Sequence, residues 1–358
     1  MNILNILFIN TSRIWGGNEK WTHLAAHELA KKHNVSLAYR SRSLGKRFSV
    51  NRHRLPFLNR LDIYSMYMLI KLVKDQEIDV LVSTNRKYYL MGAMAAMLAG
   101  CRHFVRCGIV WKVPDNIYCR FLFQNIDGVI VNARAVRDEL SRSAPVQADR
   151  VHLIYNGLDI HKLDKIDSTP QDKPYPFTII ASGELIQRKG YDFLIRAFAR
   201  FLKAKPVFNA GILLMGKGKQ QNELKLLTKK LGLEKHVTFT GFLDNPYSLM
   251  RLGDIFVSVS QNEGISNSML EAMYLGLPVI TTPAGGAEEI ISHGKNGFLI
   301  DHGDENALAE FFWQLCKDKK HLLNKVGQAG SRTVMSRFSL HSMALAMEKA
   351  FDSTLRKK

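Results

Sequence analysis

Short apolar runs alternate along the chain with longer stretches in which apolar residues recur at helical spacing. Residues 3–9 form an apolar run of the length of a buried parallel strand, and the largely apolar segments 35–39, 80–83, 127–132 and 151–156 also predict strands. Residues 18–32, 63–73 and 88–98 lie between them and predict helices. The alternation resumes with predicted strands at 177–181, 210–215, 237–240 and 255–259. We therefore expect an α/β protein with parallel sheets.

A chain of 358 residues is too long for one ordinary core and predicts two domains. We expect the first domain at residues 1–172 and the second at 173–335. The polar, proline-bearing stretch 165–176 is the expected linker. A terminal segment, residues 336–358, should form a further amphipathic helix, beginning near residue 341.

The composition is that of a globular protein, with 46% apolar and 23% charged residues. No apolar stretch is long enough to cross a membrane, and the opening MNILNILFINTS has no basic n-region, so we interpret it as a buried strand. The cysteines have neither metal-ligand spacing nor a disulfide framework: Cys101, Cys107, Cys119 and Cys316. They predict reduced thiols in a cytoplasmic protein.

The formal charge of +18 indicates an anionic partner. Nucleic acid is disfavoured, because no interleaved basic and aromatic pattern or zinc-finger spacing is present. The segment from Arg40 to Arg60 is rich in arginine, has no acidic residue and contains Phe48, Leu55, Phe57 and Leu58. Since each cation near an anionic membrane contributes about 1 kcal/mol, we predict reversible membrane docking here. A solvated loop without a partner is the alternative.

The most informative stretch is residues 261–286, QNEGISNSMLEAMYLGLPVITTPAGG. A glycine loop leads to a helix that should begin at Ser266 or Asn267, whose first amides can hold an anion. Carboxylates of Glu263 and Glu271 about 4 Å from a diphosphate would repel it by several kcal/mol. We therefore expect them to accept hydrogen bonds from hydroxyls flanking the diphosphate, as in a nucleotide-sugar. The alternative is a loop glutamate and a solvated helical one.

This stretch resembles the signature of the retaining glycosyltransferases of family 4, which have the GT-B fold. The E-x7-E pair is followed by Ala272, Met273, Gly276, Pro278, Val279, Ile280, Gly285 and Gly286. The resemblance is close over residues 177–300 and looser over 1–172. It implies two Rossmann-like domains facing across a deep cleft, the first binding the acceptor and the second the nucleotide-sugar. It also implies that residues 336–358 return to the first domain.

The resemblance further implies which residues bind the donor. Lys189 matches the family lysine, and we infer that Arg188 replaces the family arginine, whose usual position holds Glu184. Arg188 could instead be a solvated surface charge. Glu263 would bind sugar hydroxyls and Glu271 the ribose. The remaining donor-binding residues predicted are Gly16, Gly17, Gly183, Gly216, Phe242, Gly264, Ile265, Ser266 and Asn267. A tight turn is the alternative for the Gly16–Gly17 pair.

Residues 103–114 depart from the family pattern. Many relatives carry a histidine at the end of this strand, where this chain has Cys107 or Gly108. Arg106, Trp111 and Lys112 suit an anionic or glycan acceptor through ion pairing and ring stacking. A structural loop is the alternative.

We therefore predict a retaining glycosyltransferase that needs neither metal nor cofactor, since no Asp-x-Asp is present. Its donor would be UDP- or GDP-linked and its acceptor a glycan or a lipid-linked glycan, in lipopolysaccharide or surface polysaccharide synthesis. The expected location is the inner face of the cytoplasmic membrane. A catalytically inactive glycan- or membrane-binding scaffold and a nucleotide-sugar epimerase are the alternatives, and the E-x7-E pair argues against the epimerase.

Overall fold

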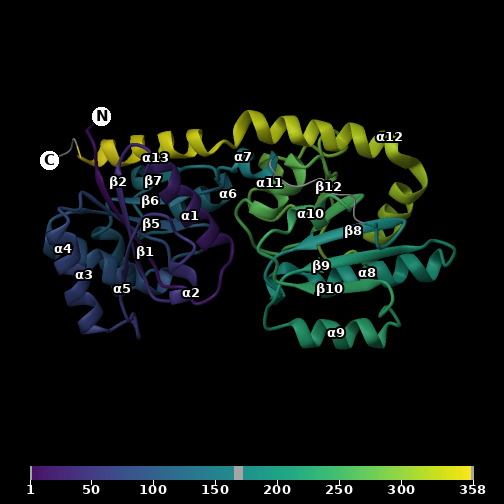
Figure 1. The fold of residues 1–358 in the computed structure, drawn as a ribbon, viewed down its shortest axis with the longest axis horizontal. Coiled ribbons are helices and arrows are strands. Elements are labelled where there is room, and N and C mark those ends of the chain that lie inside the picture. The colour runs from purple at the N-terminus through teal and green to yellow at the C-terminus, as the bar shows by residue number, and fades with distance from the viewer. Residues whose placement is uncertain (1, 165–171, 356–358) are drawn as a thin grey trace. The chain divides into compact units, whose positions relative to one another are not determined.

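The computed structural model describes residues 2–164 and 172–355. The chain divides into two compact units. The first unit contains Met1–Gly157 and Phe338–Lys358, and the second contains Leu158–Arg337. Each unit is an α/β layer structure in which helices cover a twisted parallel sheet (Figure 1).

Among the described residues of the first unit, seven parallel strands form one sheet. Their spatial order is β3 (Asn51–Arg54), β2 (Asn34–Tyr39), β1 (Asn5–Asn10), β4 (Val80–Ser83), β5 (Arg102–Cys107), β6 (Gly128–Val131) and β7 (Val151–Leu153). The helices are α1 (Gly17–Leu29), α2 (Arg42–Gly45), α3 (Ile63–Asp75), α4 (Tyr89–Ala99), α5 (Ile117–Gln124), α6 (Arg134–Arg142) and α13 (Leu340–Leu355).

The first core joins the start of the chain to its end. Because β1 is central, its side chains are buried on both faces, and Phe8 packs edge-on against Trp21 of α1. Helix α13 completes this core, with the Phe351 ring 4.9 Å from that of Phe104. Glu348 of the same helix pairs with Lys32 at 2.8 Å. The prediction that the last helix returns to the first domain is therefore confirmed.

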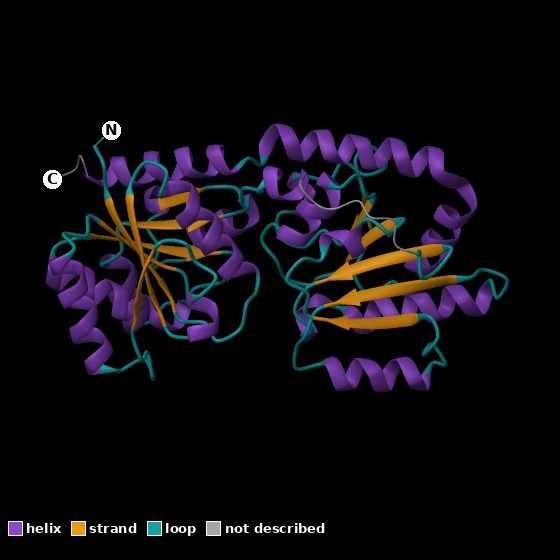
Figure 2. Ribbon diagram, in the orientation of Figure 1, coloured by secondary structure: helices purple, strands orange, loops and turns teal. Residues whose placement is uncertain are grey.

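The second sheet contains six parallel strands within the described residues. Their order is β10 (Val237–Gly241), β9 (Ala210–Met215), β8 (Phe177–Ser182), β11 (Ile255–Ser258), β12 (Val279–Thr281) and β13 (Phe298–Leu299). The helices are α7 (Ile160–Asp164), α8 (Tyr191–Ala204), α9 (Gln221–Lys230), α10 (Tyr247–Met250), α11 (Asn267–Tyr274) and α12 (Glu305–Arg337). Figure 2 shows the strands of each sheet with helices packed around them.

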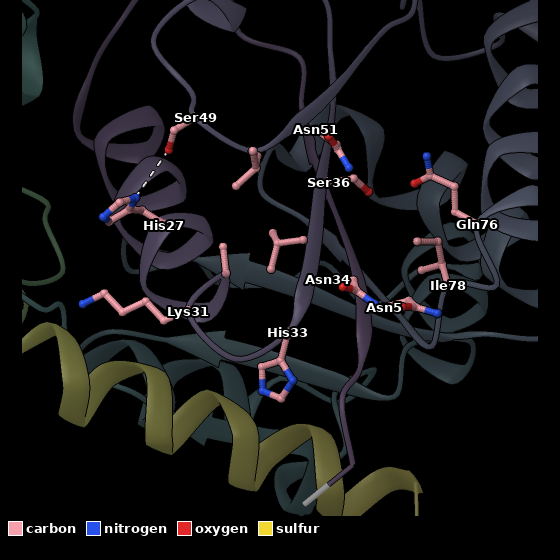
Figure 3. Close-up of a pocket in the computed structure, with 13 residues that line it drawn as sticks. Asn5, His27, Lys31, His33, Asn34, Ser36, Ser49, Asn51, Gln76 and Ile78 are labelled. Carbon is pink, nitrogen blue, oxygen red and sulfur yellow. Dashed lines mark hydrogen bonds between the residues drawn. The ribbon is translucent and has the colours of Figure 1, made fainter.

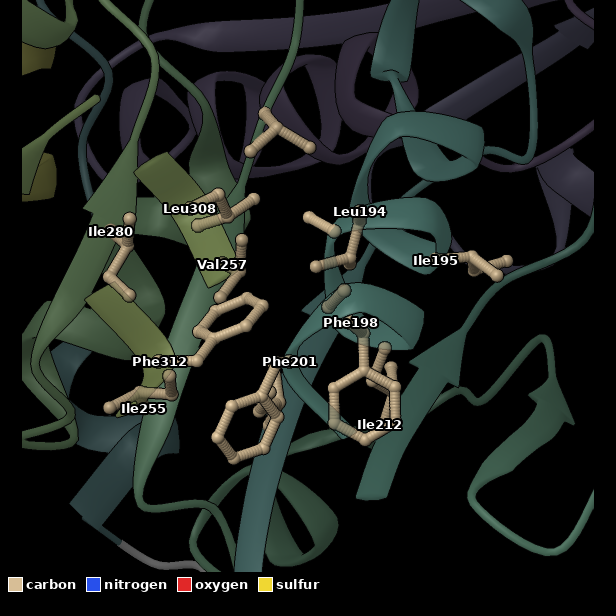
Figure 4. Close-up of a cluster of buried hydrophobic side chains, with 14 of the residues drawn as sticks. Leu194, Ile195, Phe198, Phe201, Ile212, Ile255, Val257, Ile280, Leu308 and Phe312 are labelled. Carbon is tan, nitrogen blue, oxygen red and sulfur yellow. The ribbon is translucent and has the colours of Figure 1, made fainter. Parts of the chain in front are cut away.

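Aromatic rings fill the second core (Figure 4). Phe198 and Phe201 project from α8 toward Phe312 of α12, and the Phe201 and Phe312 ring centroids are 6.1 Å apart. Apolar residues of β8, β9 and β11 form the floor of this cluster. The core thus holds β8 and β11 firmly side by side, which matters for the loops that follow them.

The predicted fold class is confirmed. Several elements were not predicted, among them strand β3 and helix α2. The units divide at Gly157, before the predicted boundary at 172, because α7 is tied to the second unit: the Tyr274 hydroxyl donates to Asp164 at 2.6 Å. Much of the predicted linker, residues 165–171, lies outside the described residues.

Most of the apolar side chains of the basic segment are buried. Phe48, Leu55 and Phe57 are buried in the first unit, and of the four apolar residues expected to face a membrane only Leu58 is exposed. No helix in the described part of the chain combines the length and the apolar character that a membrane span requires.

Candidate active site

The predicted donor residues lie on loops at the carboxyl edge of the second sheet. From β8 the chain moves to β9 on one side, whereas β11 lies on the other side of β8. This reversal makes the space between the ends of β8 and β11 a topological switch point, where open α/β sheets bind ligands. The loop after β8 carries Arg188 and Lys189, and the loop after β11 carries Glu263.

These three residues form one charged cluster. Arg188 Nη1 donates to Glu263 Oε1 at 2.8 Å, and the Lys189 ammonium contacts the same oxygen. The Lys189 and Glu263 side chains are only 12% and 13% exposed. Burial raises the pKa of Glu263, but Lys189 and Arg188 outweigh it and hold that pKa below its usual value. Two cations and one carboxylate leave the cluster with a net charge of +1, which suits an anion.

The two carboxylate oxygens of Glu263 have different surroundings. Both cations contact Oε1, and no described residue donates a hydrogen bond to Oε2. A carboxylate held by its Oε1 in this way still offers the lone pairs of Oε2 to a hydroxyl donor. The cluster therefore combines a positive charge with a fixed acceptor.

Backbone contacts set the position of the cluster. The Gln261 amide donates to the Arg188 carbonyl at 2.8 Å, which ties the two loops together. Gly285 has a φ of 61°, and a Cβ there would overlap the Glu263 carbonyl oxygen. Gly286 N donates to Gly264 O at 2.9 Å. Glycine is required at 285 both for the left-handed backbone and for this close approach.

Helix α11 begins at Asn267 with Ser266 as its N-cap, as predicted. The Ser266 hydroxyl pairs with Ser268 at 3.0 Å and does not cap the helix amides. Ile265 is buried, and so is Glu271, at 3% exposure. The alternative of a solvated Glu271 is therefore wrong, because this side chain lies on the inner face of the helix.

Gly183, Gly216 and Phe242 follow β8, β9 and β10. A Cβ on Gly216 would overlap the Gly183 carbonyl, so these glycines let two loops approach each other. Phe242 is 38% exposed at the end of its strand. All three lie at the same edge of the sheet as Lys189, and their contact with a donor stays a prediction.

The first unit has its own switch point, between β1 and β4. Gly16 is the N-cap of α1 and Gly17 begins the helix, and their contact with a donor stays a prediction. Glu19 is buried and accepts a hydrogen bond from the Ser12 hydroxyl at 2.5 Å. Asn18 donates to the Thr84 carbonyl after β4 at 2.8 Å, so the loops on both sides of the switch point are joined.

The predicted acceptor residues have unequal access to solvent. Arg106 is buried, donates to Asn18 Oδ1 at 2.9 Å and lies 4.5 Å from the Trp21 ring centroid. Cys107 is also buried, and this raises the pKa of its thiol, which donates to the Ile109 carbonyl. Arg106 thus braces the α1 loop. An acceptor role for it stays a prediction.

Trp111 and Lys112 lie farther along the same loop. The Trp111 ring is partly exposed and stacks against the Arg86 guanidinium at 4.1 Å. Lys112 is exposed. The aromatic face that we expected to stack on a sugar is thus covered on one side by a cation.

Sequence reasoning missed one group of residues. Arg13, Arg40, Arg42 and Arg54 surround a cavity of about 730 Å³ at the carboxyl edge of the first sheet. Three of them belong to the basic segment already noted, whereas Arg13 gave no signal of its own. A second cavity, of about 670 Å³, lies among Asn5, Asn34 and Asn51 at the opposite, amino edge (Figure 3). Ligands of doubly wound sheets bind at the carboxyl edge, which favours the first cavity.

The chain matches two family models. Residues 15–162 match "Glycosyltransferase Family 4", and residues 164–333 match "Glycosyl transferases group 1".

Among the described residues, no three histidine, cysteine or acidic side chains are grouped as a metal site would need.

Curated relatives include two proteins of Rhizobium meliloti (strain 1021). The lipopolysaccharide core biosynthesis glycosyltransferase LpsD is 33% identical over 53% of this chain and 52% of its own length. The corresponding enzyme LpsE is 28% identical over 61% and 62%. The chain thus matches only about half to three-fifths of the length of these relatives.

Solved structures share the fold over nearly the whole chain. The Anabaena protein HepE, in complex with UDP-glucose, has a TM-score of 0.83 at 21% identity, covering 98% of this chain and 100% of its own. A glycosyltransferase from Rickettsia africae ESF-5 has the same TM-score at 19% identity and full coverage of both chains. Each half of the chain is thus similar to a glycosyltransferase family model, and the two Rossmann-like units form the GT-B fold.

Proposed function

We propose that this protein transfers a sugar from a nucleotide-sugar to a glycan or lipid-linked acceptor, with retention of anomeric configuration and without a metal. The observation that carries the proposal is the cluster of Arg188, Lys189 and Glu263 at the switch point of the second sheet. The match of residues 164–333 to the model of glycosyl transferases group 1 supports the same activity.

The cations would stabilise the leaving group. As the sugar–phosphate bond breaks, negative charge grows on the diphosphate, and fixed positive groups in a partly dehydrated site stabilise it. Lys189 and Arg188 would supply this charge in place of a metal ion. Amides of Gly264, Ile265 and Asn267 at the start of α11 would bind the phosphate oxygens.

The carboxylates would bind hydroxyls. Glu263 Oε2 is the acceptor offered to the sugar, since Oε1 is engaged by the two cations. Glu271 would bind the ribose. We propose attack on the same face from which the diphosphate leaves, with a leaving phosphate oxygen taking the proton of the acceptor hydroxyl. Neither glutamate then needs to move a proton.

The relatives suggest the donor and the pathway. The HepE complex contains UDP-glucose, and LpsD and LpsE are named for lipopolysaccharide core biosynthesis. We therefore propose a UDP-sugar ahead of a GDP-sugar, and an acceptor in surface glycan synthesis at the inner face of the cytoplasmic membrane.

Membrane docking would use the loop before α3. Leu58 and Leu61 of this loop are largely exposed, as are Ile63 and Tyr64 at the start of α3, and Arg60 lies beside them in the sequence. Apolar side chains next to a cation suit an anionic lipid surface. Leu61→Ser/Ile63→Ser should reduce flotation with anionic vesicles, whereas Val207→Ser, equally exposed on the second unit, should not. Equal flotation of both variants would refute this docking site.

A thermal-shift panel of UDP-, GDP-, ADP- and CDP-sugars tests the donor proposal. One nucleotide class should raise the melting temperature, and the nucleoside diphosphate should be released when acceptor is added, with or without EDTA. NMR of the product gives the anomeric configuration. A chain that no member of the panel stabilises would contradict the proposal, and binding without turnover would favour an inactive scaffold.

A further inference from the structure

The cavity of about 730 Å³ in the first unit is lined by arginines from three separate segments. Arg13 follows β1, Arg40 and Arg42 follow β2, and Arg54 ends β3. Because adjacent parallel strands end at the same edge, the sheet itself gathers these side chains. Their convergence therefore follows from the fold and not from their spacing in the sequence.

In the part of the chain that the structure describes, none of the four guanidinium groups forms an ion pair with a carboxylate. The acid beside the cavity is Asp62, whose oxygens accept hydrogen bonds from Leu58 N, Ser65 N and the Ser65 hydroxyl. Like charges gathered in a concave surface repel one another and raise the local concentration of anions. The cavity is therefore suited to a multiply charged anion.

The wall of the cavity is held in an unusual conformation. Phe57, between the lining residues Pro56 and Leu58, has a φ of 44°, which is rare for a residue other than glycine. The Tyr88 hydroxyl donates to the Phe57 carbonyl at 2.6 Å, and the Phe57 amide donates to Ser65 Oγ at 2.8 Å. Such strained residues are concentrated at ligand sites. The hydrogen bonds hold Pro56 and Leu58 at the cavity.

Apolar side chains also line the cavity. They include Leu58, Tyr64 and Met68, of which Leu58 and Tyr64 are exposed. A site with guanidinium groups and an apolar margin fits a phosphate group that is attached to a carbon skeleton.

We propose that this arginine pocket binds a phosphate or diphosphate group of the sugar acceptor. The proposal rests on the proposed transferase function and narrows the acceptor to a phosphorylated one. Guanidinium groups bind phosphate oxygens bidentately, so four of them can hold a diphosphate. The phosphate belongs either to a lipid-linked diphosphate, whose chain would lie along Leu58 and Met68, or to a phosphorylated water-soluble glycan.

Isothermal titration with inorganic pyrophosphate tests the pocket. The titrations use full-length protein carrying Lys189→Met, which weakens anion binding at the second unit. Arg40→Gln/Arg54→Gln should weaken pyrophosphate binding at least tenfold, and Arg13→Gln alone should also weaken it. The matched control is Lys46→Gln/Arg60→Gln, which removes two exposed cations of the same segment that do not line the cavity. Melting temperatures verify that each variant is folded.

Farnesyl diphosphate distinguishes the two sources of phosphate. Tighter binding of farnesyl diphosphate than of pyrophosphate, with a gain that Met68→Ala reduces, supports a lipid-linked acceptor. Equal affinity supports a water-soluble phosphorylated one. Pyrophosphate binding that is absent, or that falls equally in the pocket and control variants, would overturn the proposal. UDP-sugar binding is measured with the same pocket substitutions in protein that retains Lys189, so failure of the donor proposal is recognised independently.

Discussion

Replacing Lys189 by methionine removes one cation from the charged cluster and keeps most of the side-chain volume. Glu263 then retains only Arg188, at 2.8 Å, and the net charge of the cluster falls from +1 to 0. Since burial raises the pKa of Glu263 and only Arg188 then opposes it, that pKa should rise from its lowered position.

The magnitude follows from the low exposure of the pair. At about 3 Å and an effective dielectric constant of about 20, two unit charges attract by roughly 5 kcal/mol. Dehydrating the charges offsets much of this, and we expect a net loss of about 2 kcal/mol in the free energy of unfolding. For a diphosphate leaving group, losing one fixed cation should lower turnover by about 10² to 10³.

The assay compares wild type, Lys189→Met and Lys219→Met. Lys219 is an exposed lysine after β9 that forms no ion pair with a described carboxylate, so its substitution controls for overall charge. UDP-sugar titration gives binding, urea unfolding gives stability, and nucleoside diphosphate release gives turnover. Wild-type binding and turnover in Lys189→Met would refute the assignment of this residue to the diphosphate.

In urea unfolding, Gly285→Ala should lower the free energy of unfolding by about 1–3 kcal/mol more than Gly276→Ala does. Both glycines have a positive φ, but only a Cβ at 285 would overlap Glu263. Equal losses in the two variants would contradict this close approach. Above pH 4.5, the usual pKa, Glu263→Gln should be less stable than wild type by a constant free energy of unfolding. This difference should shrink as the pH falls through the lower pKa of Glu263 in the native protein. A difference that stays constant down to pH 3 in denaturant titrations would contradict the lowered pKa. Burial lowers the pKa of His103 to about 3, so going from pH 7.5 to 5.5 protonates this histidine only in the unfolded chain and costs about 1.4 kcal/mol. His103→Gln should remove that share of the pH dependence, and an unchanged slope would count against it.

Apolar continuity made most of the fold predictable. Strand β9 is buried throughout and β1 is buried at every residue after Asn5, so their runs stand out from the surrounding sequence. Strand β3 has the sequence NRHR and lies at the edge of the sheet, where solvent replaces a neighbour. Nothing in its pattern distinguishes it from a loop, and it was missed for that reason.

The sequence predicted which residues belong to the candidate site but not which of them contact one another. Glu263 and Lys189 were both assigned to the donor, yet 74 positions separate them and only the pairing of β8 with β11 brings them together. The burial of Arg106 against Trp21 depends on the packing of α1 on the sheet. Long-range packing of this kind leaves no trace in local sequence patterns.

Because helix α13 is part of its core, the first unit cannot complete that core until the end of the chain has been synthesised. Its Met343, Met347 and Phe351 belong to the same core as Phe8 and Trp21, which are translated more than 300 residues earlier. The second unit is contiguous from Leu158 to Arg337 and is complete before that helix is made. The first unit therefore begins to be synthesised first and completes its fold last. Until α13 is available, the apolar core residues that it covers are open to chaperone binding.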